Sequence, residues 1–288
     1  MSTRKPLYQR TFLAILICVV IFILVEAVPH MVFGVSDDDP RPGLLRITLN
    51  ILLWFVIVPL WFRLPNGGEP FRDYLTSIGL KSRFPVLSGI LLGLLAYAIL
   101  IVCIYALLGA FWRLTPDFYI PPQIGKWLGC LDSGIFEEIC ARGVILAMLL
   151  KRFKEWPAIL ISAAIFGLGH MARVLVGANI NEAMTLQVIR TFSWGVMVAY
   201  MVVKTRSLVP GILYHILGNL ITIDVTLAAS SAEWVIRVIC VGAPVAAALA
   251  SMLVCKLTLP LLRKAGALTT NTLALSEYEK FLNKIERG

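Results

Sequence analysis

The chain has 288 residues, of which 59% are hydrophobic and only 15% are charged. Soluble domains carry nearer a quarter of charged residues, so this composition excludes an ordinary water-soluble protein and predicts that lipid surrounds much of the chain. The net charge of +9 comes from basic residues that lie between apolar segments rather than in one patch. We therefore expect membrane lipid and no nucleic acid among its partners.

Eight apolar segments approach the length of about 20 residues that a helix needs to cross the hydrocarbon core. We predict an all-α polytopic membrane helical bundle with about eight transmembrane helices. Residues 1–264 would form a single transmembrane domain, with a motif-bearing core at 126–228, and residues 265–288 a cytoplasmic tail. The predicted spans are Thr11–Val28, Ile47–Phe62, Val86–Phe111, Lys126–Leu150, Pro157–Val176, Thr185–Val203, Leu208–Ala228 and Trp234–Leu259.

The distribution of loop charge predicts the orientation. Most Lys and Arg residues lie in the N-terminus, the connections around 63–83, 151–154 and 204–206, and the C-terminal tail. The alternate connections include a run of three aspartates, Asp37–Asp39. Because positive loops stay in the cytoplasm, we expect both termini to be cytoplasmic. Nothing in the sequence suggests an organelle, so we expect the cell membrane of a prokaryote.

Three charged residues fall within the fourth apolar segment. Glu137 lies 13 residues before Leu150, or roughly 20 Å of helix at about 1.5 Å per residue. Charge at that depth is costly, which makes each such residue a functional hypothesis. Residues four apart share a helix face, so Glu138 and Arg142 are predicted to pair while Glu137 points elsewhere. A purely structural ion pair would explain Glu138 and Arg142, but it would not explain a second buried glutamate.

Two histidines and an asparagine fall within the fifth and seventh segments. His170 lies in the fifth, and His215 with Asn219 four residues later lies in the seventh. Because successive spans alternate in direction, these side chains fall at a depth similar to that of Glu137. A lone buried histidine is usually a satisfied core residue, but this combination predicts one shared polar site.

Two chemistries fit this set of residues. In the first, Glu137 with His170 activates a water molecule, while His215 and Asn219 donate hydrogen bonds to a developing oxyanion. In the second, Glu137, His170 and His215 are the candidate ligands of a divalent metal such as zinc. The H-E-x-x-H signature of many zinc peptidases does not occur. Both chemistries stay open at this point, and no cofactor is assigned.

Three short motifs occur in order on separate predicted spans. Glu137 and Glu138 precede Arg142, Phe166 precedes His170, and His215 precedes Asn219. Together they resemble the motifs E-E-x-x-x-R, F-x-x-x-H and H-x-x-x-N of the CAAX protease and bacteriocin-processing (CPBP) family, also called Abi. Each motif alone is weak, but the combination at mid-membrane depth is specific. The resemblance covers roughly residues 132–223.

The resemblance implies an eight-helix intramembrane endopeptidase. Eukaryotic members of the family remove the last three residues of prenylated CAAX proteins, and bacterial members process peptides or confer bacteriocin immunity. It implies that Glu137 activates water with His170, that His215 and Asn219 form an oxyanion hole, and that Glu138 and Arg142 support the site. A peptide or a lipidated protein would be the substrate, and metal dependence stays undecided.

A different class of function also fits the polar residues. Buried Glu and His side chains occur in proton relays, so a transporter, an immunity protein or a scaffold protein is the alternative. Transporters often show paired broken helices in two related halves, and this sequence shows no such symmetry.

Overall fold

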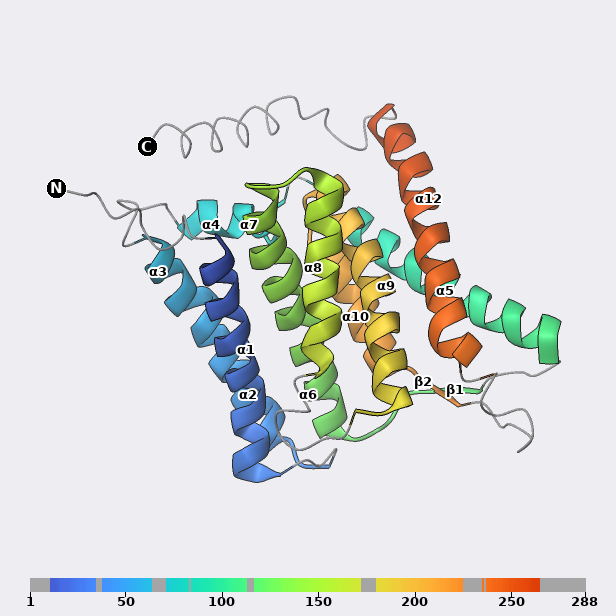
Figure 1. Ribbon diagram of the computed structural model, residues 1–288, viewed down its shortest axis with the longest axis horizontal. Coiled ribbons are helices and arrows are strands. Elements are labelled where there is room, and N and C mark those ends of the chain that lie inside the picture. Colours follow the sequence, from blue (N-terminus) through green and yellow to red (C-terminus); the bar gives the residue numbers. More distant parts are fainter. Residues whose placement is uncertain are drawn as a thin grey trace.

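The computed structural model describes residues 11–34, 38–63, 71–82, 84–112, 117–171, 180–224, 235 and 237–264. These residues form a bundle of helices with one short two-stranded ribbon (Figure 1). The predicted helical membrane bundle is confirmed. Large apolar side chains cover its outside, among them Phe12, Leu87 and Val102, each about two thirds exposed. Such a surface suits lipid rather than water as the solvent.

The first half of the chain forms the helices at one side of the bundle. Helix α1 (Thr11–Phe33) contains Pro29 and continues past the predicted end at Val28. Helix α2 (Arg41–Leu52) has Pro42 in its first turn. It passes through a π-helical turn, η2 (Leu53–Ile57), into α3 (Val58–Arg63). Helices α4 (Phe71–Ser77) and α5 (Val86–Trp112) follow.

The motif-bearing helix runs from Ile124 to Leu150 but is not a regular α-helix. It consists of α6 (Ile124–Asp132), the π-helical segments η4 (Ser133–Glu137) and η5 (Ile139–Ile145), and α7 (Leu146–Leu150). The uniform α-helix expected here is therefore wrong over its central part. Each π-helical turn inserts an extra residue and redirects the side chains around it, and such turns occur frequently at functional sites.

The second half of the chain completes the bundle with α8 (Glu155–Gly169), α9 (Glu182–Thr205), α10 (Val209–Leu220), the π-helical turn η7 (Val238–Gly242) and α12 (Ala243–Lys264). The side chain of Asn181 caps α9 by accepting a 2.9 Å hydrogen bond from the backbone N–H of Met184. Arg206 ends this helix in a left-handed conformation, with a φ of 57°.

Two short strands join distant segments at one end of the bundle. Strand β1 (Asp117–Tyr119) precedes α6, and strand β2 (Thr222–Asp224) follows α10. They pair antiparallel, with Phe118 opposite Ile223. The ribbon therefore holds the end of α10 close to the beginning of the motif-bearing helix, and it is an exception to the all-α prediction.

Among the described residues, five helices are long and apolar enough to cross a membrane: Phe12–Phe33, Arg41–Leu60, Val86–Gly109, Glu182–Thr205 and Ile239–Pro260. The other three predicted spans do not meet that standard in the described part of the chain. The fourth carries too many charges, α8 has 15 residues, and α10 has 12. Residues 172–176, 225–228, 234 and 236 of the predicted spans lie outside the described residues. So does the tail, and the boundary at residue 264 stays a prediction.

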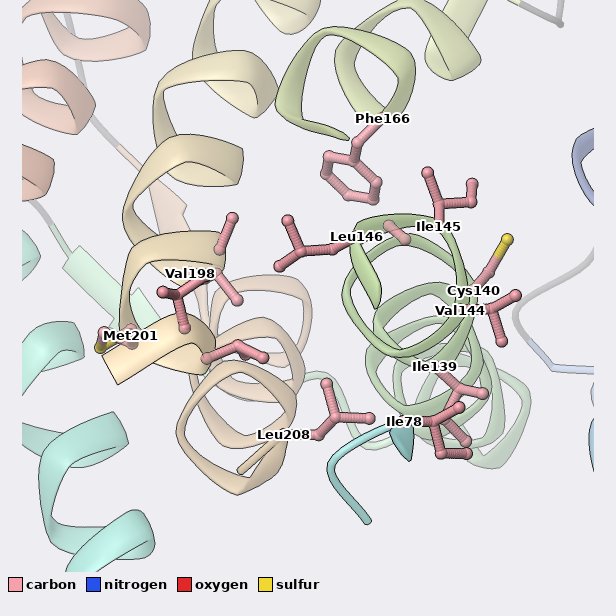
Figure 2. Close-up of a cluster of buried hydrophobic side chains, with 14 of the residues drawn as sticks. Ile78, Ile139, Cys140, Val144, Ile145, Leu146, Phe166, Val198, Met201 and Leu208 are labelled. Atoms are coloured by element: carbon pink, nitrogen blue, oxygen red, sulfur yellow. The ribbon is translucent and has the colours of Figure 1, made fainter. Parts of the chain in front are cut away.

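An apolar core packs the motif-bearing helix against α9, α10 and the segment that follows α4. Figure 2 shows Ile139, Val144 and Leu146 of the motif-bearing helix in this cluster, together with Met201 and Leu208. Each of these side chains is at most 3% exposed. The core therefore fixes the position of the motif-bearing helix on its Leu150 side.

Candidate active site

Glycines bring α10 into close contact with the motif-bearing helix. A Cβ added at Gly134 would lie 2.4 Å from Ile216 of α10. A Cβ added at Gly211 would lie 2.4 Å from Val198 and 3.3 Å from Oε2 of Glu138. These contacts leave no room for a larger residue. The short distance between the two helices places His215 against the motif glutamates.

Glu138 is the centre of a fully buried charged group. Its Oε1 accepts a 3.1 Å hydrogen bond from Nη1 of Arg142 and lies 3.0 Å from Nδ1 of His215. The side chains of Glu138 and Arg142 are both 0% exposed. The ion pair expected from the four-residue spacing is therefore present. An ionised carboxylate only accepts hydrogen bonds, so an ion pair of Glu138 with Arg142 requires Nδ1 of His215 to be the hydrogen-bond donor.

Glu137 approaches the same histidine from its other nitrogen. Its Oε2 lies 3.9 Å from Nε2 of His215, and its side chain is 22% exposed. Glu137 points away from the pair formed by Glu138 and Arg142, as expected from its position on the helix. The two glutamates of the motif thus contact opposite edges of one imidazole. We call Glu137, Glu138, Arg142 and His215 the motif cluster.

Aromatic rings enclose the motif cluster. The guanidinium of Arg142 lies 3.9 Å from the centroid of the Phe166 ring, a cation–π contact. Trp194 meets His215 edge to face, with 4.2 Å between ring centroids. The resemblance pointed to Phe166, but Trp194 lies on α9, outside the three motifs, so the sequence analysis missed it. These rings keep the imidazole and the guanidinium in fixed orientations.

His170 lies at the edge of this group. It caps the C-terminal end of α8, and its Nδ1 lies 3.0 Å from the backbone oxygen of Phe166. The Phe166 ring contacts His170 at 5.0 Å and His215 at 6.1 Å, measured between centroids. Phe166 therefore connects the two histidines. The predicted pairing of Glu137 with His170 stays a prediction.

Asn219 is held by a residue that the sequence analysis did not select. Its Nδ2 donates a 2.9 Å hydrogen bond to Oγ of Ser133, and Ser133 in turn donates to the backbone oxygen of Gly129 at 2.9 Å. Because the hydroxyl proton of Ser133 is used by Gly129, its oxygen can only accept from the Asn219 amide. Ser133 could have been selected from the sequence because it lies four residues before Glu137.

The predicted metal ligands do not form a metal site in the described part of the chain. No three His, Cys, Asp or Glu side chains lie close enough together there to hold a metal ion. The arrangement of Glu137, His170 and His215 therefore does not fit the zinc alternative, and we derive no step through a metal.

A second buried polar group lies next to the first and was also missed. Asn50 of α2 donates to Glu26 of α1 at 3.0 Å and to Asp132 of α6 at 3.2 Å. Arg46 pairs with Asp132 at 3.3 Å and with Glu26 at 3.7 Å. Trp54 donates to the side-chain oxygen of Asn50 at 3.2 Å. We call Glu26, Arg46, Asn50 and Asp132 the α1–α2 cluster, which ties these two helices to the motif-bearing helix.

Residues 126–221 match the family model described as type II CAAX prenyl endopeptidase Rce1-like. The resemblance to the CPBP family is confirmed over this segment. The match covers about a third of the chain and contains all three motifs. No curated protein and no solved structure matches the chain. The CPBP match supports the function of an intramembrane CAAX-type endopeptidase in general, without assigning a role to any single residue.

Proposed function

We propose that this protein is an intramembrane endopeptidase in which Glu137, assisted by His170, activates a water molecule. The water oxygen adds to the scissile carbonyl carbon, the C–N bond breaks, and the proton taken from water passes to the leaving amine. The substrate is a prenylated CAAX-type protein or a membrane-associated peptide. The observation that carries this proposal is that both motif glutamates lie next to the buried imidazole of His215, within the segment that matches the family model.

The charge balance of the motif cluster supports these roles. Two carboxylates face one arginine, so a single proton shared between Glu137 and His215 makes the cluster neutral. In the reactive form of the site the general base Glu137 must be ionised, and we propose that the proton lies on His215 in that form. The resulting imidazolium donates to Glu138 through Nδ1 and keeps Nε2–H for a developing oxyanion. The buried Glu138 carboxylate stabilises this imidazolium, much as a carboxylate orients the histidine of a catalytic triad.

Asn219 would supply a second donor to the oxyanion. Its Nδ2 carries two protons, and Ser133 accepts one of them. The other is available to the reacting carbonyl oxygen. Two preorganised donors in a site shielded from bulk water would stabilise the tetrahedral intermediate. Ser133 would act as a positioning residue, because it holds the nitrogen of the amide rather than its oxygen toward the site.

We further propose eight spans, with both termini in the cytoplasm of a prokaryotic cell. α8, α10 and the motif-bearing helix would complete the five long apolar helices. The beginning of α1 and the end of α12 lie at the same end of the bundle (Figure 1), as an even number of spans requires. Short and charged helices are tolerated inside a membrane protein where neighbouring helices cover them.

A cleavage assay on the purified, detergent-solubilised protein tests the proposal. A quenched prenylated CAAX peptide and an unprenylated control would be incubated with wild type and Glu137→Ala, with and without chelator. We expect cleavage by wild type that is unaffected by chelator and absent from the variant. Cleavage of neither peptide, by protein that is folded and monodisperse, would favour the transporter or immunity alternative. Loss of cleavage with chelator would restore the metal chemistry.

A further inference from the structure

Two residues of the candidate site lie toward one end of the bundle, while Glu137 lies midway along the motif-bearing helix. His170 is the residue that ends α8, and Asn219 is the last residue but one of α10. Strand β2, which pairs with β1, follows directly after α10. We call this end, where β1, β2 and the beginning of α6 lie in Figure 1, the site end.

The opposite end is where α8 and α10 begin, and contacts between its connections define it. Lys204 near the end of α9 pairs with Glu155 at the start of α8 at 2.6 Å. The backbone N–H of Leu208, just before α10, donates to the oxygen of Gly79 after α4 at 3.0 Å. Figure 1 shows α4, α7 and the end of α12 at this end of the molecule.

The connections at this opposite end are strongly basic. They comprise residues 63–83, 151–155 and 204–206, which hold nine Lys or Arg and three Asp or Glu. Arg10 immediately precedes α1 in the sequence, and Lys264 is the last residue of α12. These two basic residues add to the positive charge of this end. We call it the basic end.

The connections at the site end carry the opposite balance. Residues 34–41, 113–126, 170–182 and 221–237 hold five Lys or Arg and seven Asp or Glu. Arg41 at this end pairs with Asp39 at 2.7 Å. The side-chain and backbone hydrogen bonds from Arg41 lower the pKa of Asp39, so that carboxyl is ionised at neutral pH. By the positive-inside rule, the basic end faces the cytoplasm and the site end faces away from it.

The packing differs between the two sides of the motif cluster. On the basic side of Glu138 the core of Figure 2 is apolar and tightly packed, with Val198, Met201 and Leu208 each 0% exposed. A Cβ added at Gly143 would lie 3.2 Å from Ile78. On the other side the partly buried Ser133 and Asn219 lead toward the end of α10. Water and a peptide backbone need such polar groups along their path.

We infer that the site takes its substrate from the non-cytoplasmic face of the membrane, so that the substrate is an exported peptide or the extracytoplasmic segment of a membrane protein. This inference rests on the proposed function and narrows its substrate class. A prenylated tail made in the cytoplasm would meet the basic end and the apolar core, not the catalytic groups.

Accessibility of the site can be measured without a substrate. Gly218 and Gly169 are exposed, adjoin Asn219 and His170, and have no atom within 4 Å of an added Cβ. Gly218→Cys and Gly169→Cys would be labelled in intact cells with a membrane-impermeant maleimide. Lys151→Cys, at an exposed position of the basic end, is the matched control. Wild type gives the background from the six native cysteines, four of which are buried.

We expect at least about tenfold stronger labelling of the two glycine variants than of Lys151→Cys in intact cells, and the reverse in inside-out vesicles, because the maleimide does not cross the bilayer. Labelling of Lys151→Cys from outside, or of neither glycine variant from outside, would overturn the inference. Two glycine positions are used so that misfolding of one variant does not decide the result.

Activity gives a second readout. A charged, membrane-impermeant fluorogenic peptide would be offered to right-side-out and inside-out vesicles that contain wild type or Glu137→Ala. We expect cleavage dependent on Glu137 in right-side-out vesicles, and its restriction to inside-out vesicles would overturn the inference. No such cleavage even in detergent would count against the proposed function instead, while the labelling would still decide which face the site opens to.

Discussion

The two buried polar clusters of this protein share a set of two carboxylates and one arginine but differ in their fourth member. Each holds two carboxylates and one arginine: Glu137, Glu138 and Arg142 in one, and Glu26, Asp132 and Arg46 in the other. In the motif cluster the fourth member is His215, whereas in the α1–α2 cluster it is Asn50. An imidazole gains and loses a proton near neutral pH, but an amide does not.

The hydrogen bonds show what this difference means. Asn50 donates to two carboxylates and accepts from Trp54, so its polar atoms are engaged in bonds between helices. His215 uses Nδ1 on Glu138, while its Nε2 stands 3.9 Å from Glu137, beyond hydrogen-bond distance. One cluster is a closed network suited to holding helices. The other keeps a proton donor and an ionisable carboxylate side by side, as catalysis requires.

The largest expected effect comes from making the same substitution at one glutamate of each cluster. Glu137→Gln removes the general base, and we expect kcat to fall by about three orders of magnitude, within the range of general-base catalysis. The matched variant Glu26→Gln keeps the volume of the side chain, and we expect its kcat to stay within about threefold of wild type. Steady-state cleavage by equal amounts of folded protein measures both. Equal losses in the two variants would show that the clusters do not differ in role.

A smaller loss is expected where the charge behind the histidine is removed. Glu138→Gln leaves Arg142 buried without its counter-ion and His215 without a charged acceptor. We expect a decrease in kcat of about 100-fold, together with a loss of roughly 3–5 kcal/mol in stability. Thermal unfolding in detergent, combined with cleavage rates, separates the two effects. A variant with normal activity would show that Glu138 has no part in the reaction.

The α1–α2 cluster should respond in stability rather than in rate. Asn50→Leu removes the hydrogen bonds that Asn50 makes with Glu26, Asp132 and Trp54, while Arg46 still pairs with the two carboxylates. We expect the free energy of unfolding to fall by about 1–3 kcal/mol for each group left without a hydrogen bond. The kcat of the folded fraction should be unchanged. Denaturation curves with activity measured on the same samples would check this, and a change in kcat without a change in stability would refute the structural role.

The smallest expected effect tests whether Ser133 acts through Asn219. Ser133→Ala frees the amide of Asn219 to rotate, and we expect kcat to fall about fivefold with KM unchanged, in line with the loss of one hydrogen bond of about 1 kcal/mol. Ser133→Thr keeps a hydroxyl and should restore most of the rate. In a double-mutant cycle the loss should vanish in the Asn219→Ala background. Additive losses would instead mean that Ser133 acts independently of Asn219.

Local spacing made part of this site predictable from the sequence. The pair of Glu138 and Arg142 follows from four residues of helix, and the separate direction of Glu137 follows from one more step around it. The position of His170, His215 and Asn219 within apolar segments identified them as residues of interest, and the family resemblance added Phe166. Hydropathy predicted a helical membrane bundle because an apolar surface of this extent requires lipid.

The parts that sequence reasoning missed depend on contacts between distant segments. Trp194, Ser133 and Asn50 belong to no local motif, and each acquires its contact only when helices pack together. The π-helical segments of the motif-bearing helix were missed because a hydropathy pattern does not reveal an extra residue in a helical turn. The pairing of β1 with β2 joins residues more than 100 positions apart, and three-residue strands leave almost no pattern in a sequence.

The most direct test of the central claim is mass spectrometry of the products formed in water labelled with heavy oxygen. Purified wild type and Glu137→Gln would be incubated with the same peptide. The account predicts that wild type releases two fragments, that the new carboxyl group carries one heavy oxygen, and that Glu137→Gln yields neither fragment. Cleavage that persists in Glu137→Gln would contradict the assignment of Glu137 as the base that activates water.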